Sequence, residues 1–196
     1  MNKRESIIKA ALDEFSQNDY EQASINKIIK EAKTSKGNFY HYFKNKEELY
    51  MALVSEAYQK KLENVIYVET DDFFEQLQHQ IMNGIQFAKD YPAYYQLSRR
   101  FAKEKGSNIY NRVIKEIVDC HKVDETDTSL VKSYQKQLID NDYPLAFVEK
   151  VMYYTFENIN DAMEQENMEL SNIQNVLELT MKLLKNGLQA KNPLHE

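Results

Sequence analysis

The chain has 196 residues, 42% of them hydrophobic, and a formal net charge of −6 at pH 7. That apolar content is sufficient for a folded core and argues against a disordered chain. Cys120 is the only cysteine, which excludes an intrachain disulfide and favours a reducing, cytoplasmic setting. Because no apolar leader follows Met1 and no run approaches the roughly 18 apolar residues of a membrane span, we expect no membrane partner.

The charge is unevenly distributed. Residues 1–50 hold nine Lys and Arg against eight Asp and Glu, which leaves a net charge of −7 for the other 146 residues. Between residues 24 and 46 a single acid, Glu31, faces six lysines: Lys27, Lys30, Lys33, Lys36, Lys44 and Lys46. A basic cluster on an acidic protein fits a small DNA-binding head or, equally, a solvated helix face.

The spacing of apolar residues predicts an all-α fold. Only four glycines and three prolines interrupt the chain, and no segment alternates strictly between apolar and polar residues. A first helix is predicted over about 3–17, with an apolar stripe of Ile7, Ile8, Ala11, Leu12 and Phe15. Ser24, Ser35 and Asn45 occupy N-cap positions before three further helices.

The buried sides of these helices follow from the same spacing. Phe39 and Phe43 are predicted to point inward from the third helix. The fourth helix is predicted to bury Leu49, Leu53 and Leu62, and Glu48 to complete a capping box with Asn45. Longer helices are predicted near 71–90, 92–104, 107–122, 127–140, 144–166 and 170–190, about nine to ten helices in all.

Three capped helices within residues 1–46 indicate a helix-turn-helix domain, with the motif over about 24–43 and a helical body over 47–196. The third helix of such a unit enters the DNA major groove. Lys36 and Asn38 are suited to read bases, and the glycine at position 37 permits close approach of a partner. The remaining predicted DNA contacts, mainly to phosphates, are Ser24, Thr34, Ser35, Tyr40, His41, Tyr42 and Lys46.

Residues 24–49 resemble the signature of the tetracycline-repressor (TetR) family. The spacing Ser35-x-Gly37-x-x-Tyr40-x-x-Phe43-x-x-Lys46-Glu47-x-Leu49 carries the resemblance, and the start of the third helix is similar to that of Gram-positive multidrug-sensing members. Ala11-Leu12-x-x-Phe15 with Tyr20 fits the first helix of the family. The chain departs from the pattern at Lys33 and Asp19, where the family usually has glycine, and a lysine in a left-handed turn is strained.

The resemblance implies a ligand-responsive repressor that binds a palindromic operator in double-stranded DNA as a homodimer. A small lipophilic or aromatic effector, of unknown identity, would release it. Residues expected near the effector are Tyr94, Tyr95, Phe101, Tyr110, Cys120, Tyr134, Met152, Tyr153 and Phe156. Residues expected in the dimer interface are Val148, Ile159, Val176, Leu177, Leu184 and Leu188.

Other classes of function have less support. The chain has no Glu-x-x-His pair, no cysteine pair, no Gly-rich phosphate loop and no Gly-x-Ser-x-Gly elbow, so we expect no enzyme, no metal and no cofactor. Cys120 as a redox switch, and an activator or a protein-binding member with a vestigial head, remain alternatives. The polar and basic residues Lys36, Asn38, His41 and Lys46 argue against a vestigial head.

Overall fold

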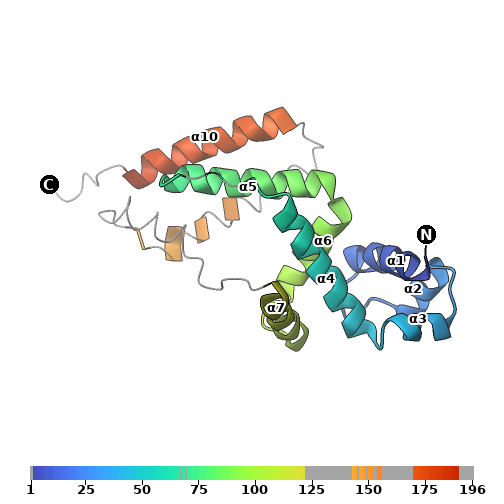
Figure 1. Cartoon of the computed structure of the whole chain (residues 1–196). Helices are drawn as coiled ribbons and strands as arrows, with labels where there is room; N and C mark the ends of the chain where they lie inside the picture. Colours follow the sequence, from blue (N-terminus) through green and yellow to red (C-terminus); the bar gives the residue numbers. More distant parts are fainter. Residues whose placement is uncertain are drawn as a thin grey trace. The chain divides into compact units, whose positions relative to one another are not determined.

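A computed structural model describes residues 2–66, 68, 70–121, 143–144, 146–148, 150–151, 154–155 and 170–189. Every regular element among these residues is a helix, as the sequence predicts (Figure 1). Within the same ranges, no helix is long and apolar enough to span a membrane. The chain forms two compact units, Met1–Val65 with Gln86–Glu125 and Ile66–Ile85 with Thr126–Glu196. The division expected after residue 46 falls inside the first unit.

Four capped helices open the first unit. They are α1 (Lys3–Gln17), α2 (Ile25–Glu31), α3 (Lys36–Tyr42) and α4 (Lys46–Glu63). Ser24, Ser35 and Asn45 are the N-caps of α2, α3 and α4, and each side chain accepts a backbone N–H from the first turn of its helix. The three predicted caps are therefore confirmed, because capping depends only on neighbours in the sequence.

Two capping boxes differ from expectation. At α1, Asn2 and Glu5 exchange hydrogen bonds of 2.9 and 3.1 Å between side chain and backbone, a capping box that the sequence analysis missed. At α4, the Asn45 side chain accepts the Glu48 N–H at 2.8 Å as predicted. The Glu48 carboxylate, however, accepts the N–H of Lys44 at 2.7 Å, one residue before the N-cap. Only half of the predicted box is thus present.

The core of the first unit joins α1 to α4 with α6 (Pro92–Lys103) and α7 (Asn108–His121). Helix α1 packs against α2, α3, α4 and α6. The fully buried side chains include Ile7, Phe15, Ile28, Phe39, Leu49, Leu53, Leu97 and Val113. Each contributes about 1.5–3 kcal/mol through burial. Leu62 is 38% exposed, so its predicted burial is wrong, because the last turn of α4 extends beyond this core.

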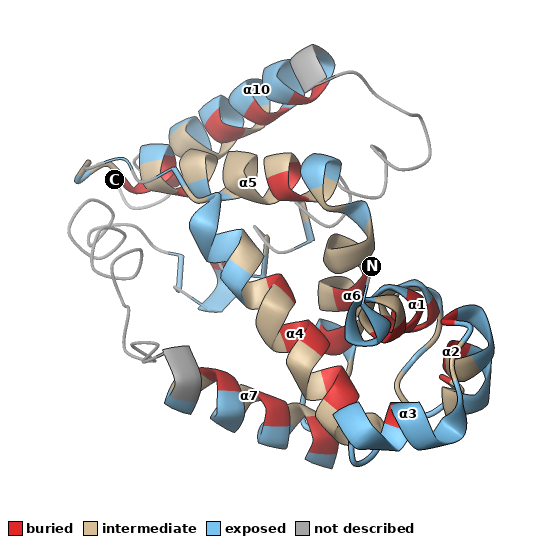
Figure 2. Cartoon of the chain, turned by 45° about the vertical axis from the view of Figure 1, so that its right-hand side comes forward, coloured by how far each residue is buried: buried red, intermediate tan, exposed pale blue. Residues whose placement is uncertain are grey.

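The described core of the second unit lies between α5 (Phe73–Asp90) and α10 (Leu170–Gln189), which run side by side in Figures 1 and 2. Its buried residues are Phe73, Phe74, Leu77, Ile85, Val148, Ile173, Leu177, Met181 and Leu188. An ion pair of 3.0 Å between Lys185 and Asp72 flanks it. The helix predicted near 127–140 lies outside the described residues, and that near 144–166 is described only in part, with residues 146–148, 150–151 and 154–155 helical.

The residues expected in a dimer interface have different environments. Val148, Leu177 and Leu188 are buried in the core of their own unit, and Leu184 packs partly buried against it. Ile159 lies outside the described residues. The apolar side chains that α10 leaves exposed are Val176 (37%), Leu179 (58%) and Leu183 (73%).

Candidate nucleic-acid interface

Helices α2 and α3 are joined by a four-residue turn from Ala32 to Ser35. The turn begins at the end of α2, where the N–H of Lys33 donates to the Lys30 carbonyl at 3.1 Å and that of Thr34 to the Ile29 carbonyl at 3.2 Å. Lys33 has a φ of 47°, in the left-handed region that favours glycine. The strain expected at this lysine is therefore present.

Helix α3 has one buried and one exposed side (Figure 2). The ring of Phe39 is fully buried and that of Phe43 is 3% exposed, and both rings anchor the helix to the core. The other residues of the helix are exposed: Lys36, Gly37, Asn38, Tyr40, His41 and Tyr42. Tyr40 and Tyr42 are 45% and 37% exposed, so they are not core residues.

The exposed side combines cations, amides and aromatic hydroxyl groups. The Lys36 ammonium lies 6.0 Å from the centre of the Tyr40 ring, and the rings of His41 and Tyr42 meet edge to face at 5.0 Å. Among the described residues, and apart from the adjoining backbone of α3, the nearest heavy atom to a Cβ at Gly37 would be the Ser35 hydroxyl oxygen at 3.9 Å. The fold itself therefore does not require glycine at this exposed helical position.

The hydroxyl groups of Ser24 and Ser35 cap helices, whereas that of Thr34 is buried. Ser24 accepts the Lys27 N–H at 3.3 Å and Ser35 accepts the Asn38 N–H at 3.1 Å. Each serine oxygen acts as an acceptor in its cap, which leaves the hydroxyl proton to donate to a phosphate. The Thr34 hydroxyl oxygen is buried, unlike the accessible phosphate contact expected from the sequence.

Lys46 also differs from expectation. The sequence predicts a phosphate contact, but the Lys46 Nζ donates to the carbonyl oxygens of Tyr20 at 2.6 Å, Glu21 at 3.1 Å and Ala23 at 3.2 Å. The same ammonium lies 4.6 Å from the centre of the Tyr20 ring. Its described contacts are thus with the loop between α1 and α2, at Asn18–Ser24.

Charged side chains from α1 and α6 hold the same loop and were not identified from the sequence. Glu14, 5% exposed, accepts the Ser24 N–H at 3.1 Å and pairs with Lys27 at 2.5 Å. Glu104, the residue after α6, accepts the Tyr20 N–H at 3.0 Å. Burial raises the pKa of the Glu104 carboxyl, and the charges of Asp19 and Glu21 add to this effect.

Arg100 completes this set of contacts from α6. Its Nε donates to the Ser16 carbonyl at 2.9 Å, and its terminal nitrogen pairs with Asp19 at 2.7 Å. Each of the four charged residues lies 10 to 84 positions from its loop partner in the sequence; the four are Glu14, Lys46, Arg100 and Glu104. Local periodicity carries no signal for such contacts.

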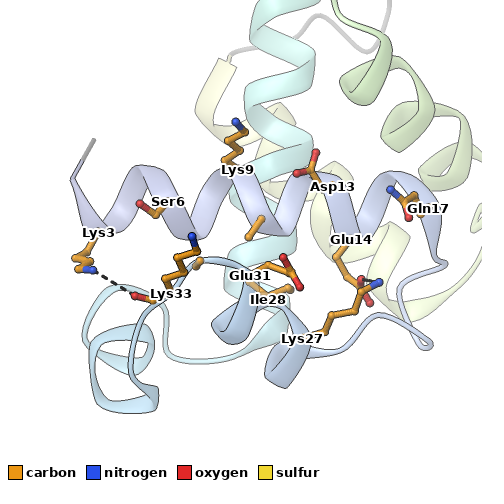
Figure 3. Close-up of a pocket in the computed structure, with 12 residues that line it drawn as sticks. Lys3, Ser6, Lys9, Asp13, Glu14, Gln17, Lys27, Ile28, Glu31 and Lys33 are labelled. Atoms are coloured by element: carbon orange, nitrogen blue, oxygen red, sulfur yellow. Dashed lines mark hydrogen bonds and ion pairs between the residues drawn. The ribbon is translucent and has the colours of Figure 1, made fainter.

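A groove of about 590 Å³ lies between α1 and α2 (Figure 3). Ala10, Ile28 and Ala32 contribute its apolar surface, and its charged residues are Lys3, Lys9, Lys27, Lys33, Asp13, Glu14 and Glu31. Lys3 Nζ donates to the Lys33 carbonyl at 3.3 Å, which links the start of α1 to the turn before α3. The groove carries charges of both signs and therefore has no single preferred ligand charge.

Among the residues expected near an effector, Phe101 and Tyr110 stack at 4.8 Å within the core region of the first unit. The Tyr94 hydroxyl donates to Glu56 at 2.5 Å, and the Arg99 guanidinium lies 6.0 Å from the Tyr95 ring. Tyr134, Met152, Tyr153 and Phe156 lie outside the described residues, and the side chain of Cys120 is likewise not described. In the described part of the chain, no cluster of His, Cys, Asp and Glu is arranged to hold a metal.

Comparison with known proteins identifies the N-terminal part of the chain, which contains α1 to α3. Residues 7–53 match the model for "Bacterial regulatory proteins, tetR family". The uncharacterized HTH-type transcriptional regulator YuxN of Bacillus subtilis (strain 168) is 38% identical over 68 residues, 35% of this chain and 23% of the relative. The HTH-type transcriptional regulator QacR of Staphylococcus aureus (strain Mu50 / ATCC 700699) is 34% identical over 55 residues, 28% and 29% of the two chains.

The fold is shared over a greater length. A TetR family transcriptional regulator from Chloroflexus aurantiacus J-10-FL superposes with a TM-score of 0.71 at 23% identity, covering 94% of this chain and 92% of that structure. The matches to the curated relatives named above span less than a third of their own lengths. These relatives are transcriptional regulators and not enzymes, as the sequence predicts for this chain. The N-terminal segment, residues 7–53, therefore matches the TetR family of bacterial regulatory proteins, and the chain shares its fold with a solved regulator of that family.

Proposed function

We propose that the chain is a DNA-binding transcriptional regulator that inserts α3 into the major groove of an operator. The observation that carries this proposal is the division of α3 into a buried side, Phe39 and Phe43, and an exposed side that begins with Lys36, Gly37 and Asn38. Residues at the N-terminal end of a recognition helix contact base edges. Lysine pairs with guanine acceptors and asparagine with adenine, so these two side chains would read sequence.

The exposed aromatic residues and the serine caps would position the helix. Tyr40, His41 and Tyr42 present donors beside the helix, and Ser24 and Ser35 present hydroxyl protons at the N-termini of α2 and α3. Contacts of this kind to phosphates set register and orientation without reading sequence. Because DNA is the proposed target, we place the protein in the cytoplasm.

We also propose that the chain acts as a homodimer on a palindromic operator. The exposed apolar side chains Val176, Leu179 and Leu183 follow one another at intervals of three and four residues, so they share a face of α10. In a two-fold dimer such a face would pack against its own copy. A helix-turn-helix dimer reads two half-sites about 34 Å apart, one turn of the duplex.

Repression would be relieved by a small lipophilic or aromatic effector. The family resemblance and the abundance of tyrosine, fourteen in the chain, support this part of the proposal. An effector acts by binding more tightly to a conformation whose two heads do not fit the operator. Titration of candidate compounds against operator binding tests it, and an operator affinity unchanged across a broad library would contradict it.

Selection of duplexes bound by the full chain from random DNA tests the DNA-binding proposal. We expect an enriched sequence with two-fold symmetry and two chains bound per duplex. Lys36→Ala is expected to cost about 1–3 kcal/mol and to relax preference at one base pair of each half-site. Failure to enrich any sequence, with the folded full chain at low salt, would contradict the proposal.

A further inference from the structure

The ammonium group of Lys46 has no free N–H in this structure. A lysine side chain carries three N–H donors. The carbonyl oxygens of Tyr20, Glu21 and Ala23 provide three acceptors at 2.6, 3.1 and 3.2 Å. The Tyr20 ring, 4.6 Å from Nζ, faces the same charge. Contact with a phosphate would require the ammonium to give up at least one of these bonds, each of which is strengthened by its charge.

The three carbonyl groups belong to one short loop. Tyr20, Glu21 and Ala23 precede Ser24, the N-cap of α2. Backbone groups of a loop need partners when water is restricted, and this loop obtains them from charged side chains. Lys46 binds its carbonyl groups, whereas Glu104 and Glu14 accept the N–H groups of Tyr20 and Ser24 at 3.0 and 3.1 Å.

Lys46 is the first residue of α4, so these bonds connect the start of α4 to the start of α2. The turn at residues 32–35 is the link from α2 to α3. A change in the loop would therefore shift the entry of α2 and, through the turn, the angle at which α3 meets DNA. Misplacement of a binding element by about 1 Å is enough to weaken recognition.

We propose that Lys46 is a positioning residue for DNA recognition: it fixes the α1–α2 loop and makes no direct contact with phosphate. This inference rests on the DNA-binding function proposed above, but its structural half concerns the free protein. Lys36 and Lys44 provide the comparison, because both side chains are exposed and lie close to Lys46 in the sequence.

The reactivity of lysines in the wild-type full chain tests the structural half without any substitution. Brief acetylation, followed by mass spectrometry of peptides, measures the rate at each lysine. We expect Lys46 to react about tenfold more slowly than Lys44, because the ammonium must first leave charge-assisted hydrogen bonds. A rate at Lys46 equal to that at Lys44 would overturn the inference, whether or not DNA is bound.

The same reaction in the presence of a selected duplex tests the functional half. We expect DNA to protect Lys36 and to leave the slow rate at Lys46 unchanged. Strong protection of a fast-reacting Lys46 would identify a phosphate contact and overturn the inference. If DNA protects no lysine and no duplex binds, the proposed function fails, whereas the rate at Lys46 in the free protein still decides the structural half.

Substitution then separates the two roles by salt dependence. Each phosphate contact contributes about 0.9 to the slope of log affinity against log salt concentration. Lys46→Met is expected to weaken binding about tenfold at every salt concentration without changing this slope. It should also accelerate hydrogen exchange at the Tyr20 and Ser24 amides, which merely lowered global stability would not do selectively.

Matched variants make the comparison decisive. Lys44→Met removes the same charge and should leave the rate of hydrogen exchange at the loop amides unchanged. Lys46→Arg keeps the charge and the donors, so it should recover part of the affinity. Lys46→Met with a slope reduced by about 1 and normal exchange in the loop would overturn the inference. If Lys46→Met does not fold, the acetylation rates of the wild-type chain still decide it.

Discussion

Gly37→Ala is expected to stabilise the fold and at the same time to weaken operator binding. Gly37 lies in α3, and a Cβ there would meet only the Ser35 hydroxyl oxygen at 3.9 Å, an ordinary contact. Alanine is favoured over glycine in an exposed helix by about 0.5–1 kcal/mol. With no clash to offset this gain, the free energy of unfolding should rise by about that amount.

DNA binding should change in the opposite direction. If α3 lies in the major groove with its Gly37 backbone against the duplex, an added methyl group is an overpacked contact, which costs about 1–3 kcal/mol. Operator affinity would fall by about 5- to 150-fold. Urea unfolding followed by circular dichroism measures the first effect, and fluorescence anisotropy with a selected duplex measures the second.

Gly84→Ala is the matched control. Gly84 lies in the middle of α5, and among the described residues outside its own stretch of helix no heavy atom lies within 4 Å of where a Cβ would stand. This variant should gain a similar stability and keep full operator affinity. If Gly37→Ala bound the operator as tightly as the wild type, the close approach of DNA to α3 would be refuted.

Three further predictions concern other parts of the chain. Lys33→Gly should raise the free energy of unfolding in urea titrations by about 1 kcal/mol, because glycine adopts the φ of 47° without strain. Lys33→Ala should give no such gain, and equal effects of the two substitutions would contradict backbone strain at this position. Leu183→Glu changes a side chain that is 73% exposed, and it should convert dimers to monomers in sedimentation experiments without changing the helical content. Persistence of the dimer would exclude this face of α10 as the dimer interface. Burial raises the pKa of Glu104, so its contribution to stability is present below the unfolded value near 4.5 and is lost as pH rises through the folded value. The advantage of Glu104→Gln over the wild type in urea unfolding should therefore be largest at pH 7 and shrink toward pH 4, and the opposite trend would contradict this sign.

Local sequence determined the helices of the head. The caps Ser24, Ser35 and Asn45, and the inward direction of Phe39 and Phe43, were predicted correctly. Caps and helical periodicity involve residues no more than four positions apart, so a single sequence contains the whole signal. The Asn2–Glu5 capping box has the same kind of signal in its spacing and was overlooked.

Tertiary structure decided how the charged and apolar side chains are used. Lys46 and Lys36 are alike as lysines of one basic segment, yet Lys46 binds carbonyl groups 23 to 26 positions away and Lys36 is exposed. On α10, Leu177 is buried whereas Leu183 is exposed. Such differences depend on which helices pack together, because contacts between distant segments leave no periodic trace in the sequence. The sequence thus determined where the capped helices of residues 1–63 begin, and packing determined which of their side chains remain exposed.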